Sequence, residues 1–122
     1  MNDRSHHRLA LIGARGYTGR ELLERVMRHP AIELALAASG ARAGRPITDE
    51  VPDWPDPEQT FVALTPEDVA GVEADLWALA VPNGASGPWV AAIEAAHPDA
   101  ILIDFGADYR FDPDWVYGLT EF

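Results

Sequence analysis

Short apolar runs alternate with longer stretches of mixed polarity along this chain. The run at 9–12 has the length and composition of a buried parallel strand, and so has the run at 32–38. Between them, residues 17–29 place leucine, valine and methionine at helical spacing, and Pro30 ends that pattern. This part of the chain therefore predicts a β-α-β unit.

Shorter elements continue the alternation. Further strands are predicted at 60–64, 76–81 and 100–104. A short helix is predicted over 66–71, which starts with proline, and another over 86–96, which Ser86 is expected to cap. Strands that alternate with helices predict an α/β fold with a doubly wound parallel sheet.

A long connection separates the second predicted strand from the third. Residues 40–59 are rich in glycine, proline and aspartate and show no periodicity, so we expect a surface loop. Loops of this length in compact domains are often functional. Trp54, which stands between Asp53 and Pro55, is expected to pin the loop to the domain.

Three evenly spaced glycines follow the first predicted strand. Gly13 would permit a tight exit from the strand, Gly16 would let a phosphate approach the backbone, and Gly19 would let the helix pack closely on the sheet. The helix N-terminus would add unpaired N–H groups and the positive end of its dipole. The alternative is an ordinary strand-to-helix turn, because the spacing is G-x-x-G-x-x-G rather than G-x-G-x-x-G. The predicted dinucleotide-binding residues are Gly13, Ala14, Arg15, Gly16, Tyr17, Thr18 and Gly19.

Two other loops begin at carboxyl ends of predicted strands, where doubly wound sheets bind ligands. The cofactor-binding candidates in them are Ser39, Arg42, Arg45, Pro82, Asn83 and Gly84. In NAD-binding domains, a carboxylate at the end of the second strand accepts hydrogen bonds from the ribose hydroxyls. The loop that starts at Ser39 has no such carboxylate. Its hydroxyl and arginines suit the 2′-phosphate of NADP instead. We predict NADP as cofactor. Whether Arg42 or Arg45 contacts the phosphate, or both merely solvate the loop, stays open.

The charge distribution agrees with an anion site in the first part of the chain. The net charge is −11, which argues against nucleic-acid binding by the whole protein. Residues 1–45 nevertheless hold eight of the nine arginines against four acids, a local net charge of +4. A GC-rich genome would alternatively explain a chain that is rich in alanine and arginine and has no lysine, so the support from charge is mild.

Composition and length limit the remaining possibilities. The 122 residues are expected to form one dinucleotide-binding domain at 9–122 after a disordered leader at 1–8. No cysteine is present, so these residues offer no cysteine nucleophile, disulfide or cysteine-bound metal. No metal site is predicted, because His6 and His7 lack a third ligand nearby. Without a signal peptide or an apolar run of membrane-spanning length, we expect a cytoplasmic protein that does not contact membranes.

Four segments share the order and spacing of one enzyme family. They are Gly13–Leu22, Ser39–Gly44, Ala80–Gly84, and Ile103–Phe111 followed by Tyr117-Gly-Leu. Together they resemble the cofactor-binding N-terminal portion of N-acetyl-γ-glutamyl-phosphate reductase, of the semialdehyde dehydrogenase family. The last segment is the most specific, because a Rossmann fold does not require Ala-Asp-Tyr-Arg-Phe. The resemblance covers nearly all of the chain from Leu9.

The resemblance implies a reaction of arginine biosynthesis, the NADPH-dependent reduction of an acyl phosphate to an aldehyde through a cysteine thioester. The family's cysteine, its histidine and its substrate and dimerisation domain lie beyond Phe122. The resemblance therefore implies a Rossmann-type fold that is incomplete at the C-terminus, has no catalytic residue and is inactive alone. Full-length members are homo-oligomers, whereas this chain alone is expected to be monomeric. Asp108 and Arg110 would contact the substrate or, alternatively, pair with each other.

The chain departs from the family pattern at several positions. Gly40 stands where the family has an arginine, which moves the phosphate contact to Arg42 or Arg45. Other departures are Asn83 for a histidine, Gly106 for a serine and Thr120 for a proline. The alternatives are the equivalent part of aspartate-semialdehyde dehydrogenase or of a carrier-linked lysine or ornithine pathway reductase, and a non-catalytic nucleotide-binding module.

Overall fold

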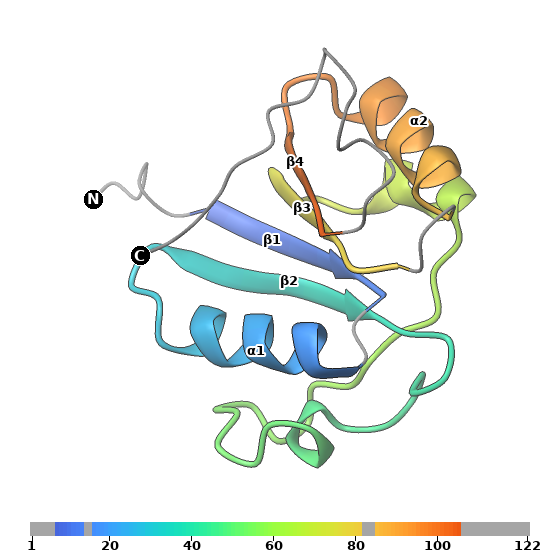
Figure 1. Cartoon of the computed structure of the whole chain (residues 1–122). Coiled ribbons are helices and arrows are strands. Elements are labelled where there is room, and N and C mark those ends of the chain that lie inside the picture. The colour runs from blue at the N-terminus through green and yellow to red at the C-terminus, as the bar shows by residue number, and fades with distance from the viewer. Residues whose placement is uncertain (1–6, 14–15, 82–84, 106–122) are drawn as a thin grey trace.

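The computed structural model describes residues 7–13, 16–81 and 85–105. Within them, four parallel strands form one sheet in the order β2-β1-β3-β4 (Figure 1). The strands are β1 His7–Ile12, β2 Ile32–Ala38, β3 Leu76–Leu79 and β4 Ile101–Asp104. The helices are α1 Gly16–Met27 and α2 Ser86–Ala96, and the 3₁₀ helices are η1 Ile47–Asp49 and η2 Pro66–Gly71.

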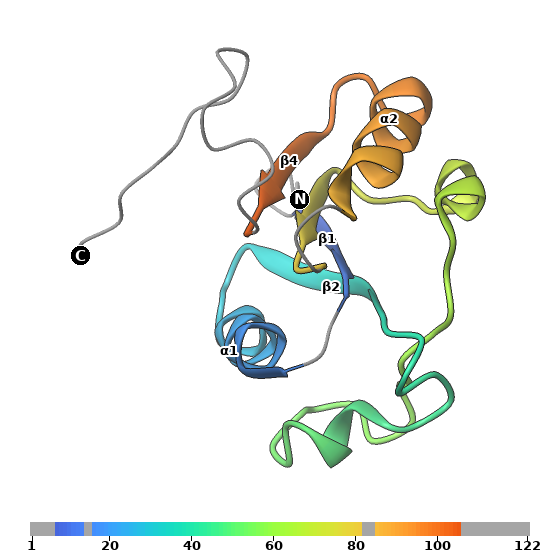
Figure 2. The same cartoon turned by 45° about the vertical axis from the view of Figure 1, so that its right-hand side comes forward.

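Both faces of the sheet are covered by helices. Along β1, successive side chains point to opposite faces. Leu11 packs in a cluster with Leu23 of α1, and Ile12 packs in a second cluster with Ile93 of α2. Figure 2 shows α1 and α2 on opposite sides of the sheet. The predicted α/β, doubly wound, Rossmann-type arrangement is confirmed.

The amino-terminal boundary of the sheet differs from the prediction. β1 begins at His7, so the two residues before Leu9 belong to the sheet rather than to a leader. The physical reason is Asp75, just before β3. Its carboxylate accepts hydrogen bonds from Nδ1 of His7 at 2.8 Å and from the backbone N–H of Arg8 at 2.7 Å.

Two predictions about single elements are wrong. Residues 60–64 form no strand, because Thr60 makes one isolated antiparallel bridge to Pro46 and Val62 makes one isolated parallel bridge to Ala38. No neighbouring pair extends either bridge into a ladder. Ser86 does not cap α2 either, since Ala85 is the N-cap residue and makes no side-chain cap bond. Ser86 is instead the first helical residue and is fully buried.

The long connection is more than a surface loop. Ile47, Val51 and Trp54 are buried in the cluster on the α1 face of the sheet. The burial of Trp54 in this cluster confirms that it pins the segment to the domain. Its Nε1 donates a hydrogen bond to Oε1 of Gln59, within the same segment, at 2.9 Å. We call residues 44–61 the strap. It is closed by backbone bonds from Gly44 N to Phe61 O, Phe61 N to Arg45 O and Ile47 N to Gln59 O, each 2.9 Å.

Candidate functional site

The carboxyl ends of all four strands meet at one edge of the sheet. The last paired row is Ala38, Ile12, Leu79 and Asp104 in sheet order. Just beyond it, bonds run from Gly13 N to Ala38 O, Ala80 N to Ile12 O and Phe105 N to Leu79 O. The chain leaves β1 for β2 on one side and later returns to β3 on the other, so the topological switch point lies between β1 and β3. Ligands bind at such points in doubly wound sheets.

Gly13 turns the chain sharply out of β1. Its φ is +83°, a left-handed conformation that side chains disfavour. A Cβ atom there would lie 2.7 Å from the carbonyl oxygen of Ala80 and 3.0 Å from Cγ1 of Val81. The structure confirms that the tight exit from the strand requires glycine.

The N-terminus of α1 follows this turn. Gly16, Tyr17, Thr18 and Gly19 form its first turn, which contains no acidic residue, and Gly19 is buried. The first N–H groups of a helix have no partner within it, and they favour a negative charge in front of them. The helix therefore offers donors beside the switch point.

The loop after β2 is fixed by its own hydrogen bonds. Ser39 is only 4% exposed, and its N–H donates to the carbonyl of Val62 at 2.9 Å. Its Oγ accepts the backbone N–H of Arg42 at 3.2 Å. Gly44 has a φ of +87° and begins the strap. The predicted cofactor loop thus has a defined shape.

The two candidate arginines have different surroundings. Nε of Arg42 donates to Oε2 of Glu50 at 2.6 Å, in an ion pair whose side chains are 26% and 20% exposed. Arg45 is exposed and forms no ion pair with any other residue described by the structure. The partner of Arg42 could not be predicted from the sequence, because no spacing rule pairs residues eight apart in a loop. The one available signal was an acid in the same connection as both arginines.

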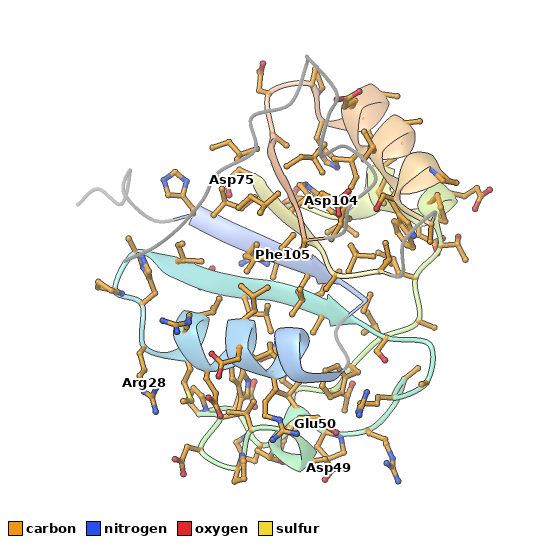
Figure 3. The ribbon with its side chains drawn as sticks, viewed as in Figure 1. Arg28, Asp49, Glu50, Asp75, Asp104 and Phe105 are labelled. Carbon is orange, nitrogen blue, oxygen red and sulfur yellow. The ribbon has the colours of Figure 1, made fainter. Side chains whose placement is uncertain are left out.

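Several predicted residues lie outside the described ranges. They are Ala14, Arg15, Pro82, Asn83, Gly84, Asp108 and Arg110, together with the departures Gly106 and Thr120. Asp104 and Phe105, which belong to the most specific segment, are the last residues of the described range 85–105 (Figure 3). Among the residues that are described, no group of three or more histidines and acids could hold a metal ion. No helix in the same ranges is long and apolar enough to cross a membrane.

The whole site lies within a stretch that matches a known family. The family model of the semialdehyde dehydrogenase NAD-binding domain matches residues 8–122. The chain belongs to this family. The chain is also similar to the N-acetyl-γ-glutamyl-phosphate reductase of Stenotrophomonas maltophilia, with 46% identity over 121 residues. This match covers 99% of this chain and 38% of the relative. The reductase of the same name from Xylella fastidiosa is 45% identical over 113 residues, covering 93% of this chain and 34% of the relative.

Solved structures similar to this semialdehyde dehydrogenase NAD-binding domain show the same fold. Aspartate semialdehyde dehydrogenase with NADP from Candida albicans has a TM-score of 0.68 at 18% identity, covering 88% of this chain and 31% of that one. A protein named RSP, solved with β-NAD⁺ and operator DNA, has a TM-score of 0.57 at 14% identity, covering 89% and 58%. These likenesses concern the fold alone.

Proposed function

We propose that this chain is the NADP(H)-binding part of an N-acetyl-γ-glutamyl-phosphate reductase of arginine biosynthesis. The substrate class is supported by relatives of that name at 42–46% identity over 93–99% of the chain. The observation that carries the cofactor assignment is the preformed loop 39–45. It contains two arginines and no carboxylate, and its backbone bonds hold it at the end of β2.

Each part of the edge has a role in this proposal. The first turn of α1 would hold the pyrophosphate, since its N–H groups and dipole favour an anion. The loop 39–45 would hold the 2′-phosphate through charge-assisted hydrogen bonds. When bound, NADPH supplies the hydride for reduction. The residues described here bind and orient it.

The covalent chemistry needs groups that these residues do not provide. The chain contains no cysteine, so the thiol implied by the resemblance would come from the rest of such an enzyme. Substrate contact by Asp108 and Arg110, homo-oligomer formation by the whole enzyme and a cytoplasmic location are further parts of the same proposal. So are cofactor contacts by Ala14, Arg15, Pro82, Asn83 and Gly84.

A binding comparison tests the cofactor assignment. NADPH should bind at least about tenfold more tightly than NADH, because a charge-assisted hydrogen bond contributes roughly 1.5–3 kcal/mol. Isothermal titration calorimetry measures both affinities. Adenosine 2′,5′-bisphosphate and 5′-AMP are the matched pair that isolates the 2′-phosphate. Equal affinities within each pair, or tighter NADH binding, would contradict the proposal.

A further inference from the structure

We propose that Glu50 sets the cofactor preference of this site by holding the charge of Arg42, so that Arg45 is the arginine that contacts the 2′-phosphate. The proposal rests on the NADP(H) function proposed above and assigns its specificity to three side chains. Glu50 is a positioning residue, since it acts through Arg42.

Arg42 is held within the loop by hydrogen bonds of its side chain and of its backbone. Its Nε donates to Glu50 at 2.6 Å, and both side chains are mostly buried. Its backbone N–H donates to Oγ of Ser39, and its carbonyl accepts the N–H of Arg45 at 2.9 Å. A partly buried pair is screened less by water and salt than an exposed one. The carboxylate therefore neutralises most of the positive charge that Arg42 could present to an anion.

Glu50 is held in place by the strap. Its N–H donates to the carbonyl of Ile47 at 2.9 Å as η1 ends, and the N–H of Val51 donates to the same carbonyl. Ile47 and Val51 are both buried in the core on the α1 face. Figure 3 shows Glu50 on this strap next to Asp49. Because core residues flank Glu50, its backbone cannot move away from Arg42 without disturbing the core.

Arg45 has a fixed backbone and an available side chain. Its N–H bonds to Arg42 and its carbonyl accepts the N–H of Phe61, so the strap holds its main chain on both sides. Its side chain is exposed and pairs with no acid among the residues that the structure describes. A guanidinium in this state can offer a bidentate edge to a phosphate.

The arrangement makes a distinctive prediction about charge. A 2′-phosphate at this loop would meet the positive charge of Arg45 and an Arg42 whose positive charge Glu50 neutralises. NADH has no such phosphate, so the charge of Arg42 matters to NADPH binding alone. Removing the charge of Glu50 should therefore tighten NADPH binding and leave NADH binding unchanged.

The experiment compares Glu50→Gln with Asp49→Asn by calorimetry. Glutamine keeps the size of the side chain and can still accept the Arg42 hydrogen bond. Asp49 is the matched control, because it is adjacent, exposed and not paired with Arg42. Glu50→Gln should tighten NADPH binding about threefold to tenfold and change NADH binding less than twofold. Asp49→Asn should change both affinities less than twofold.

Arginine variants complete the test. Arg45→Met should remove most of the preference for NADPH, and Arg42→Met should reduce it less. In the Glu50→Gln background, Arg42→Met should abolish the gain, because that gain comes from the positive charge of Arg42 that glutamine does not neutralise. A Glu50→Gln protein with unchanged or weaker NADPH binding would overturn the proposal, as would a larger loss from Arg42→Met than from Arg45→Met.

A measurement on the unaltered protein covers the case in which a variant fails to fold. Addition of adenosine 2′,5′-bisphosphate should shift the arginine Nε–H NMR signal of Arg45 and leave that of Arg42 in place. A shift confined to Arg42 would overturn the proposal. A wild-type protein that prefers NADPH no more than NADH would instead contradict the proposed function itself, so the two failures are distinguishable.

Discussion

At the scale of single residues, three glycines differ in their backbone conformation and in the space available for a side chain. Gly13 and Gly44 both have positive φ, of +83° and +87°. An added Cβ would meet the Ala80 carbonyl at Gly13 but nothing within 4 Å at Gly44. Gly40 has neither a positive φ nor a close neighbour. A side chain would therefore meet both backbone strain and a steric contact at Gly13, backbone strain alone at Gly44, and neither at Gly40.

Alanine substitutions at these glycines should lower the free energy of unfolding in a fixed order. Gly44→Ala should cost about 1–2 kcal/mol, because a side chain disfavours the left-handed region. Gly13→Ala should cost more, since the contact with Ala80 adds to that strain. Gly40→Ala should be neutral or stabilising by up to about 1 kcal/mol. Urea denaturation measures all three, and equal losses at Gly13 and Gly44 would mean that Ala80 moves aside freely.

Residue types on their own predicted only part of the site. Gly13 could be assigned from sequence because a strand followed by a glycine turn has a local geometric requirement. The different surroundings of Arg42 and Arg45 could not be assigned in this way. Glu50 reaches Arg42 only because the strap closes between residues 44–47 and 59–61. That closure depends on backbone pairing across the loop, which no local pattern reports.

At the scale of elements, the strap is the feature that sequence periodicity described least well. Ile47, Val51 and Trp54 follow one another at intervals of four and three, which is helical spacing. Prolines interrupt this stretch, so a continuous helix cannot form there. The strap meets the core with one 3₁₀ turn and one tryptophan. In contrast, β2 and β4 have the bounds or nearly the bounds predicted, because their apolar runs are continuous.

Trp54 should contribute more to stability through packing than through its hydrogen bond. Trp54→Ala should lower the free energy of unfolding by about 3–5 kcal/mol, the usual cost of removing a large buried aromatic. Gln59→Leu removes only the acceptor for Nε1 and should cost roughly 1–3 kcal/mol. Chemical denaturation gives both values. A larger loss from Gln59→Leu would show that the hydrogen bond, rather than burial, holds the strap.

At the scale of the whole molecule, Asp75 joins strands at the amino edge of the sheet, opposite the candidate site (Figure 3). Its N–H donates to the carbonyl of Arg8, and its own carbonyl accepts the N–H of Ile101, each at 3.0 Å. Its carboxylate accepts from His7 and from Arg8 N–H. Burial raises the pKa of Asp75, but the hydrogen bonds from His7 and the Arg8 backbone outweigh it, so the pKa is lowered.

This lowered pKa makes stability depend on acidity in a defined direction. A depressed pKa in the folded state means that the contribution of Asp75 is fully present above its unfolded value of 3.8 and is lost as the pH falls through the folded value. Asp75→Asn should therefore destabilise the protein at neutral pH and flatten the loss of stability on acidification. Urea midpoints between pH 7 and pH 3 test this. The exposed Asp99→Asn is the control, and an equal flattening there would contradict the role of Asp75.

The central place of β1 has a consequence for the order in which the molecule folds. Leu9 pairs with Leu34 through a short loop that contains α1, but it also pairs with Leu76 across a much longer stretch of chain. By loop-closure entropy the longer contact costs only about 1 kcal/mol more, yet local contacts form sooner. The pairing of β1 with β3 should then form after the β1-α1-β2 unit has formed. A cofactor bound at the switch point between β1 and β3 would slow unfolding without accelerating folding. The reason is that its site does not exist until the rate-limiting barrier has been crossed.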